Sequence, residues 1–146
     1  MKNNDKSMDD LLMLAMKVVQ EADANAAANP TSKEIQIVIV EPNKRPYKKM
    51  IPNTLDAMKE IVEGYIENLF IGETEKGARI GITLNEEGKL IGLPFNRRLI
   101  GSRGAFDVLV GNVFITAYNL QGDAISLNDD ECEKLIKKFT TLEVYI

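Results

Sequence analysis

The residues best suited to chemistry in this 146-residue chain lie in one short stretch, residues 95–106, which concentrates arginine, glycine and aromatic side chains. Guanidinium groups match the geometry of phosphates and carboxylates, and glycines let backbone amides approach a bound anion closely. The two phenylalanines that bracket the stretch offer rings on which a base can stack. The stretch therefore predicts a nucleotide-sized anion site made of Phe95, Asn96, Arg97, Arg98, Gly101, Arg103, Gly104 and Phe106.

A plainer interpretation of the same stretch is a basic turn between two strands. In that case the arginines are solvated or paired with surface acids, and the glycines only turn the chain. The segment "GSRGAF" lacks the G-x-x-x-x-G-K-[ST] pattern of a phosphate-binding P-loop. Spacing alone leaves both interpretations open.

The composition argues against catalysis. The sequence has no histidine, which removes Ser-His and Cys-His nucleophile pairs and histidine metal sites. The single cysteine, Cys132, lies in the acidic segment "DDECEKL", which raises a thiol pKa, so we interpret it as a packing residue. Glu60, Glu63 and Glu67 lie near helical spacing but have no matching second carboxylate group. We therefore expect no enzyme, no metal and no cofactor.

The net charge of the chain limits the classes of partner that it is expected to bind. A formal net charge of −4 and a pI near 5.0 argue against a general nucleic-acid binder. One further basic cluster groups Lys44, Arg45, Lys48 and Lys49 around Tyr47. Such a cluster can contact a phosphate backbone, or it can be a solvated turn whose lysines protect an edge strand.

No segment indicates a membrane or export. No run reaches the roughly 18 apolar residues of a membrane span. The first residues carry acids ahead of the apolar run and no small-residue cleavage site, unlike a secretion signal. With one cysteine and no disulfide framework, a reducing cytoplasm is the expected location.

The N-terminal residues predict a separate helix. Leu11, Leu12, Met16 and Val19 form one apolar stripe within residues 8–24, and "ANAAANPTSK" follows as a linker. We therefore divide the chain into residues 1–32, a helix with its linker, and residues 33–146, the main domain. The helix either packs on its own core or joins two copies into a homo-oligomer.

The sequence of the main domain predicts a series of strands interrupted by two helices. The apolar patterns and turn residues predict helices at 52–65, capped by Asn53 or Thr54 and stopped at Gly64, and at 126–139, with a capping box from Asn128 to Glu131. They predict strands at 34–40, 47–51, 65–71, 78–84, 89–95, 107–119 and 141–146. We therefore expect an α+β fold, a mainly antiparallel sheet with two packed helices and an N-terminal helical extension.

Several short motifs together resemble a known family. They are Glu41-Pro42, Pro46-Tyr47, Gly64-Tyr65-Ile66-Glu67, Asn85 with Gly88-Lys89-Leu90, and Leu93-Pro94 with Asn96-Arg97. Over about residues 35–139 the chain resembles a family of phages, plasmids and conjugative elements that is catalogued as a domain of unknown function, number 3846. The resemblance implies a mobile-element protein in a bacterial cytoplasm, and it includes Asn96 and Arg97 but neither Arg98 nor Arg103.

Three functional hypotheses follow. The first is a non-enzymatic phage-type protein that antagonises host defence by sequestering a phosphorylated nucleotide signal through Asn96, Arg97, Arg98 and Arg103. The second is an interaction module that regulates a host protein through the N-terminal helix. The third is an enzyme that uses carboxylates and arginines on a nucleotide phosphodiester.

Overall fold

The structure is a computed structural model that describes residues 33–146. The predicted helix at 8–24, its linker and its role in oligomerisation lie outside the described residues, so the boundary after residue 32 stays a prediction. The expected α+β class is wrong, because 46 % of the described residues are in strands and 16 % in helices. The two described helices are only 8 and 10 residues long, and the strands form two sheets.

The larger sheet is antiparallel throughout. Its strands run in the order β2-β1-β7-β4-β3, and the short β8 pairs with β7. The strands are β1 (Glu34–Val40), β2 (Tyr47–Pro52), β3 (Ile66–Glu73), β4 (Arg79–Asn85), β7 (Val113–Tyr118) and β8 (Ala124–Ile125). Because β2 and β3 are outermost, the most apolar strands, β1 and β7, lie inside the sheet.

The smaller sheet has three strands in the order β6-β5-β9. The strands β5 (Phe95–Gly101) and β6 (Gly104–Val110) form an antiparallel hairpin. The last strand, β9 (Glu143–Tyr145), runs parallel to β5. The stretch expected to form an anion site is therefore mostly this hairpin.

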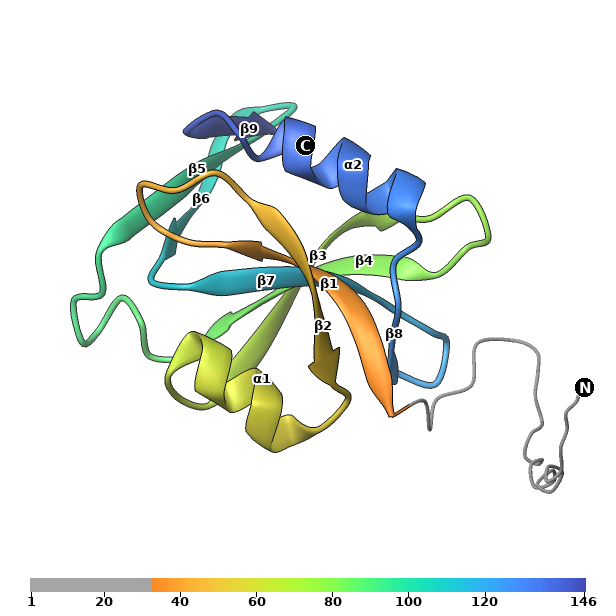
Figure 1. The fold of residues 1–146 in the computed structure, drawn as a ribbon. Coiled ribbons are helices and arrows are strands. Elements are labelled where there is room, and N and C mark those ends of the chain that lie inside the picture. The colour runs from red at the N-terminus through yellow and green to blue at the C-terminus, as the bar shows by residue number, and fades with distance from the viewer. Residues whose placement is uncertain (1–32) are drawn as a thin grey trace, which may run out of the picture. The chain divides into compact units, whose positions relative to one another are not determined.

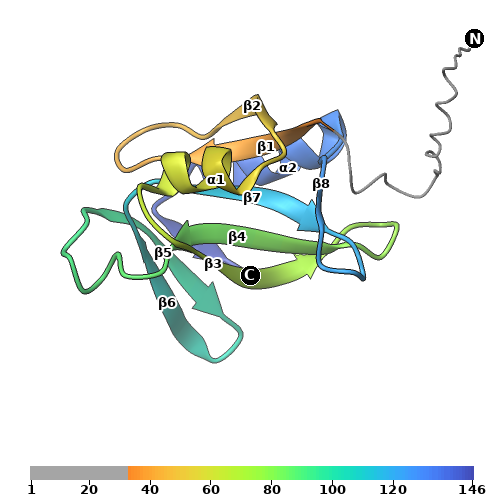
Figure 2. The same ribbon diagram turned by 90° about the horizontal axis from the view of Figure 1, so that it is seen from below.

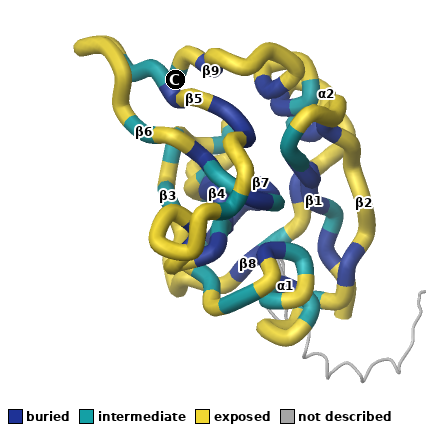
Figure 3. Tube along the Cα trace, turned by 90° about the vertical axis from the view of Figure 1, so that its left-hand side faces the viewer, coloured by how far each residue is buried: buried dark blue, intermediate teal, exposed yellow. Residues whose placement is uncertain are grey.

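The larger sheet is covered on both faces. Alternate residues of β1 divide between two apolar clusters: Ile35 and Ile37 pack with α1 (Leu55–Val62), and Val38 and Val40 pack with α2 (Asp129–Lys138) and the smaller sheet. Figures 1 and 2 show α1 and α2 on opposite faces of the sheet. The tube in Figure 3 shows that burial is concentrated along β1 and β7.

The helix α1 begins as predicted and ends one residue early. The Thr54 hydroxyl accepts a hydrogen bond from the amide of Ala57 at 3.1 Å. The left-handed stop is at Glu63, with φ of 65°, and not at Gly64. Gly64 has a different constraint, because a Cβ there would lie 2.6 Å from the side-chain nitrogen of Asn85.

The helix α2 follows its sequence pattern closely. Asn128 and Glu131 form the predicted capping box, which satisfies two backbone amides at the helix start. Cys132 and Leu135 are buried on the inner side of α2, and Phe139 is buried where the helix ends. The capping box and the buried Cys132 confirm the predicted helix and its packing cysteine.

Two predicted strands are wrong. Residues 89–92 form turns and residues 93–94 are irregular, so Asn96 and Arg97 lie within β5 and not beyond the end of a strand. The apolar run 107–119 is broken at Gly111, with φ of 71°, into β6 and β7, which belong to different sheets. The sequence does not predict this break, because residues 107–119 form a continuous apolar run and one glycine inside a strand pattern is also compatible with a bulge.

Candidate functional site

Asn96 lies in the interior and connects three segments of the chain through hydrogen bonds. Its side chain is 0 % exposed. The amide nitrogen donates to the carbonyl oxygens of Val40 at 2.9 Å and Gly111 at 2.7 Å. Asn96 therefore holds β5 against the end of β1 and the turn between β6 and β7.

Arg97 is also internal, with an exposed fraction of 2 %. Its Nε donates to the carbonyl oxygen of Phe139, and Nη2 donates to that of Lys44, both at 2.8 Å. Its Nη1 donates to the side-chain oxygen of Asn96 at 2.9 Å. Burial lowers the pKa of the guanidinium, but an arginine keeps its charge at neutral pH. Each of these partners is a neutral oxygen, so no carboxylate among them balances this buried charge.

Arg97 connects two surface segments that form the walls of a groove. Lys44 belongs to the connection between β1 and β2, and Phe139 is the C-cap of α2. Between these segments lies a groove of about 720 Å³. We call it the basic groove, and it is lined by Arg45, Pro46, Tyr47, Lys48, Glu133, Ile136, Lys137, Thr140 and Thr141.

The basic groove carries more positive than negative side chains, in a chain of net charge −4. Arg45 and Lys137 form no ion pair with any residue that the structure describes. Lys48 pairs with Asp129 at 3.1 Å, and Glu133 is the acidic residue in the lining. Two guanidinium or ammonium groups are thus available for an anion from solution.

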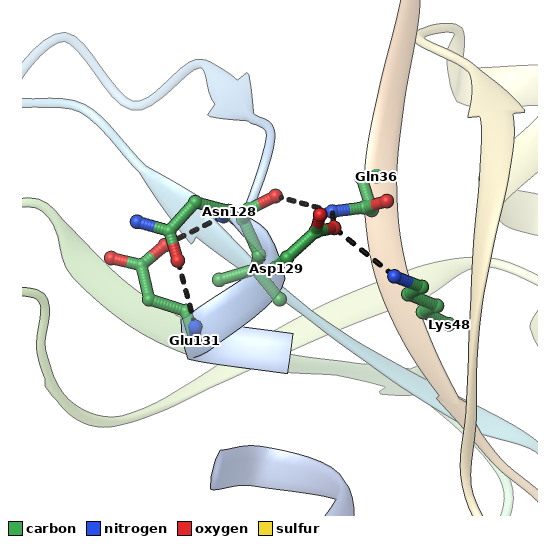
Figure 4. A network of polar contacts seen from close by, with 6 residues as sticks. Gln36, Lys48, Asn128, Asp129 and Glu131 are labelled. Carbon is green, nitrogen blue, oxygen red and sulfur yellow. Dashed lines mark hydrogen bonds and ion pairs between the residues drawn. The ribbon is translucent and has the colours of Figure 1, made fainter. Parts of the chain in front are cut away.

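The Lys48–Asp129 pair belongs to a network that holds α2 on the sheet (Figure 4). Gln36 donates to the Asp129 carboxylate at 3.0 Å, and its side chain also reaches the carbonyl oxygen of Leu127. The hydrogen bonds from Lys48 and Gln36 hold the pKa of Asp129 below its usual value, and Asp129 raises the pKa of Lys48. The network fixes one wall of the basic groove relative to β1 and β2.

The remaining lining residues supply apolar surface and acceptors. Tyr47 is 39 % exposed, and burial together with the nearby Glu41 carboxylate raises its pKa. The hydroxyls of Thr140 and Thr141 donate to the carbonyl oxygens of Ile136 and Glu143, so their protons are already engaged. An anion in the groove would therefore be held by the cations and not by these hydroxyls.

The side chain of Arg98 does not share the hydrogen-bond partners of Arg97. It forms an ion pair with Glu143 of β9 at 3.2 Å, and both side chains are about half exposed. Phe95, 44 % exposed, begins the same strand. Neither residue lines the basic groove.

The other predicted residues meet at a second groove. Gly101, Arg103, Gly104 and Phe106 line an open groove of about 380 Å³. We call it the hairpin groove, and it is completed by Phe70, Ile71, Ser102, Ala105 and Ile146. The structure therefore divides the predicted set: four residues share the hairpin groove, Asn96 and Arg97 are internal, and Phe95 and Arg98 lie apart.

The sequence profile of the family described as "Domain of unknown function (DUF3846)" matches residues 35–140. The chain belongs to the DUF3846 family. No curated protein and no solved structure matches it significantly. The match therefore confirms the family that the sequence motifs predict, and the mobile-element origin stays a prediction.

Some motif residues of this DUF3846 chain have clear structural roles. Asn85 is buried, donates to the carbonyl oxygens of Val62 and Glu63, and accepts from the amide of Glu87. It joins the end of α1 to β4, and Gly64 leaves room for it. Asn85, Asn96 and Gly64 thus act through packing and internal hydrogen bonds.

Two negative findings apply to the described part of the DUF3846 chain. No group of three or more histidine, cysteine, aspartate or glutamate residues there could hold a metal ion. No helix there is long and apolar enough to cross a membrane.

One wall of the basic groove can be recognised in the sequence, and the other cannot. The cluster around Tyr47 was visible as a basic segment. The other wall includes Lys137, which lies in the last turn of α2, where a cation commonly complements the helix dipole. Nothing in the spacing shows that this helix end lies beside Arg45, because the contact is made through Arg97.

Proposed function

We propose that this DUF3846 protein is a non-enzymatic binding protein that sequesters a phosphorylated nucleotide in the basic groove. The carrying observation is the buried charge of Arg97. It is held by neutral oxygens of Lys44 and Phe139, whose chain neighbours Arg45 and Thr140 line the groove.

Electrostatics favours an anion at this place. A charge in the low-dielectric interior acts over a longer range than one in water, and no carboxylate among its hydrogen-bond partners cancels it. Arg45 and Lys137 add exposed positive charge on the groove side. An anion in the groove interacts favourably with all three cations.

One local feature opposes an anion. The groove lies at the C-terminal end of α2, where the helix dipole is negative. Arg97 donates to the C-cap carbonyl of Phe139, and Lys137 lies in the last turn. Both cations offset the dipole, so the anion meets a net positive wall.

The size and lining of the groove suit a nucleotide better than a bare phosphate. Small-molecule sites commonly enclose roughly 300–1,000 Å³, and the basic groove measures about 720 Å³. The ring of Tyr47 and the side chain of Ile136 offer apolar surface beside the cations. A base or sugar can lie on this surface while phosphates face Arg45 and Lys137.

The proposal that no reaction follows binding rests on the available groups. The sequence has no histidine. Burial raises the pKa of Cys132 to about 11, so its thiol is neutral at physiological pH. Sequestration needs neither a nucleophile nor a general base.

The biological setting of the proposal comes from the family resemblance. That resemblance implies a mobile-element protein, and we propose that it acts in the cytoplasm of a bacterial host. There, removal of a phosphorylated signalling nucleotide would blunt a host defence that depends on it.

Calorimetric titration of the full chain tests the proposal, with ATP as the probe. Arg45→Ala and Lys137→Ala should each weaken ATP binding about tenfold or more, because each removes a charged hydrogen bond. Lys76→Ala, which removes an exposed cation outside the basic groove, should leave binding unchanged. Raising the salt concentration should weaken binding of the unmodified protein.

Equal binding of ATP by the Arg45→Ala, Lys137→Ala and unmodified proteins would contradict the proposed site. Loss of binding in Lys76→Ala to the same extent would show only a non-specific charge effect. Either result rejects the basic groove as a nucleotide site.

A further inference from the structure

The strand β6 is an edge strand with exposed residues at 104–106, followed by Asp107, whose carboxylate accepts a hydrogen bond from the Val108 amide at 2.7 Å and pairs with Lys89 at 2.6 Å. It pairs with β5 on one side, and no described strand pairs with its other side. Phe106 and Val108 on this strand are 54 % and 37 % exposed. By contrast the edge strand β2 exposes Lys48 and Lys49, which discourage pairing with another chain.

The hairpin groove lies next to this edge. Phe106 lines it from β6, and Phe70 and Ile71 line it from β3, the outermost strand of the larger sheet. Figure 2 shows the β5–β6 hairpin extending past β3. A volume of about 380 Å³ is enough to take a large apolar side chain from a segment that runs along β6.

Two arginines lie at the hairpin groove, and the nearby carboxylate of Asp107 on β6 is already paired with Lys89 at 2.6 Å. The guanidinium of Arg79 stacks on the Phe70 ring, 3.8 Å from its centroid. Arg103 lines the groove at the turn of the hairpin. Neither arginine forms an ion pair with a residue in the described range 33–146. The complementary partner is apolar where it meets the phenylalanines and acidic on either side.

We infer that β6 accepts an added strand from an acidic segment of a partner protein, which places an aromatic side chain in the hairpin groove. A polypeptide is the occupant that fits best, because only a backbone offers donors and acceptors at the spacing of a strand edge. The phenylalanine contacts supply affinity, and Arg79 and Arg103 select for acidic sequence. This site is separate from the basic groove, so it does not rest on nucleotide binding.

The test uses a blocked heptapeptide in which glutamate alternates with valine around a central phenylalanine, and a second peptide with lysine in place of glutamate. Fluorescence anisotropy with the full-length protein should show binding of the acidic peptide and no binding of the basic one. Hydrogen exchange should slow at backbone amides of β6 when the acidic peptide is added.

Variants locate the site. Phe106→Ala and Arg103→Glu should each weaken the acidic peptide at least tenfold. Phe95→Ala, which removes an exposed phenylalanine of the same sheet outside the groove, should have no effect. Arg45→Ala, in the basic groove, should also have no effect, so that this test is independent of the nucleotide proposal.

Three outcomes would overturn the inference. Equal binding of both peptides would contradict the selection for acidic sequence. Unchanged binding in Phe106→Ala would show that the peptide does not use the hairpin groove. If neither peptide binds and Phe106→Ala instead converts an oligomer into a monomer in ultracentrifugation, the edge belongs to a second copy of the chain.

Discussion

At the scale of single residues, the central feature is an arginine that points inward. Arg97 has the residue type and the neighbours of a ligand-binding group, and the sequence could identify it as notable. Its direction could not be predicted, because it depends on carbonyl oxygens of Lys44 and Phe139, which are 53 and 42 residues away in the chain. Strand alternation alone also misleads, since Asn96 and Arg97 are consecutive and both buried.

The buried network predicts a large loss of stability in Arg97→Met. Methionine is also long and flexible, but it leaves the carbonyl oxygens of Lys44 and Phe139 and the side-chain oxygen of Asn96 without their donor. Since each unsatisfied buried group costs about 1–3 kcal/mol, we expect a loss of about 3 kcal/mol or more in urea unfolding. Arg97→Lys keeps the charge and part of the hydrogen bonding, so it should lose less. A stability within 1 kcal/mol of the unmodified protein in Arg97→Met would refute this role of the network.

At the scale of elements, local signals predicted most helices and strands but not their partners. The capping box at Asn128 and the cap at Thr54 depend on residues within one turn, and both are found. The break at Gly111 could not be predicted, because a single glycine in an apolar run is also compatible with a bulge. The need for glycine there is non-local, since a Cβ would lie 2.6 Å from the side chain of Leu93. The predominance of strands was underestimated for a similar reason, since the hairpin β5–β6 begins in residues that look like a loop.

The docking of α2 on the sheet predicts a dependence of stability on pH. Lys48 and Gln36 lower the pKa of Asp129 from 3.8. A depressed native pKa means that the folded protein favours the carboxylate, so the stabilisation is complete above about pH 4 and is lost as the pH falls through the native value. Asp129→Asn should therefore lower the urea midpoint at neutral pH, and the difference from the unmodified protein should shrink as the pH is lowered below 3.8.

The Lys48→Met variant provides the matched control for this prediction. The hydrogen bond from Lys48 is the largest cause of the lowered pKa of Asp129. Asp129→Asn should therefore have a smaller effect on stability in a Lys48→Met background. If the urea midpoints of Asp129→Asn and the unmodified protein differ by the same amount at all pH values, Asp129 does not contribute through its charge.

At the scale of the whole molecule, two grooves of different character lie on an acidic protein. The basic groove combines exposed cations with a buried one, whereas the hairpin groove combines phenylalanines with a strand edge that no described strand pairs with. The cluster around Tyr47, which lines the basic groove, is a separate segment in the sequence analysis. The anion site predicted from residues 95–106 joins two groups that the structure separates, the hairpin-groove residues and the internal Asn96 and Arg97. Their separation follows from the hairpin, which turns Gly101, Arg103 and Gly104 away from the inward-facing Asn96 and Arg97. The account therefore separates nucleotide binding from partner binding.

The most direct test of the central claim is native mass spectrometry of the full chain purified from bacterial cytosol, followed by heat release and analysis of what it carried. We predict a stoichiometric phosphorylated nucleotide on the unmodified protein and its loss from the double variant Arg45→Ala, Lys137→Ala. An empty unmodified protein, or a double variant that retains the same compound, would contradict the proposal that the basic groove sequesters a nucleotide.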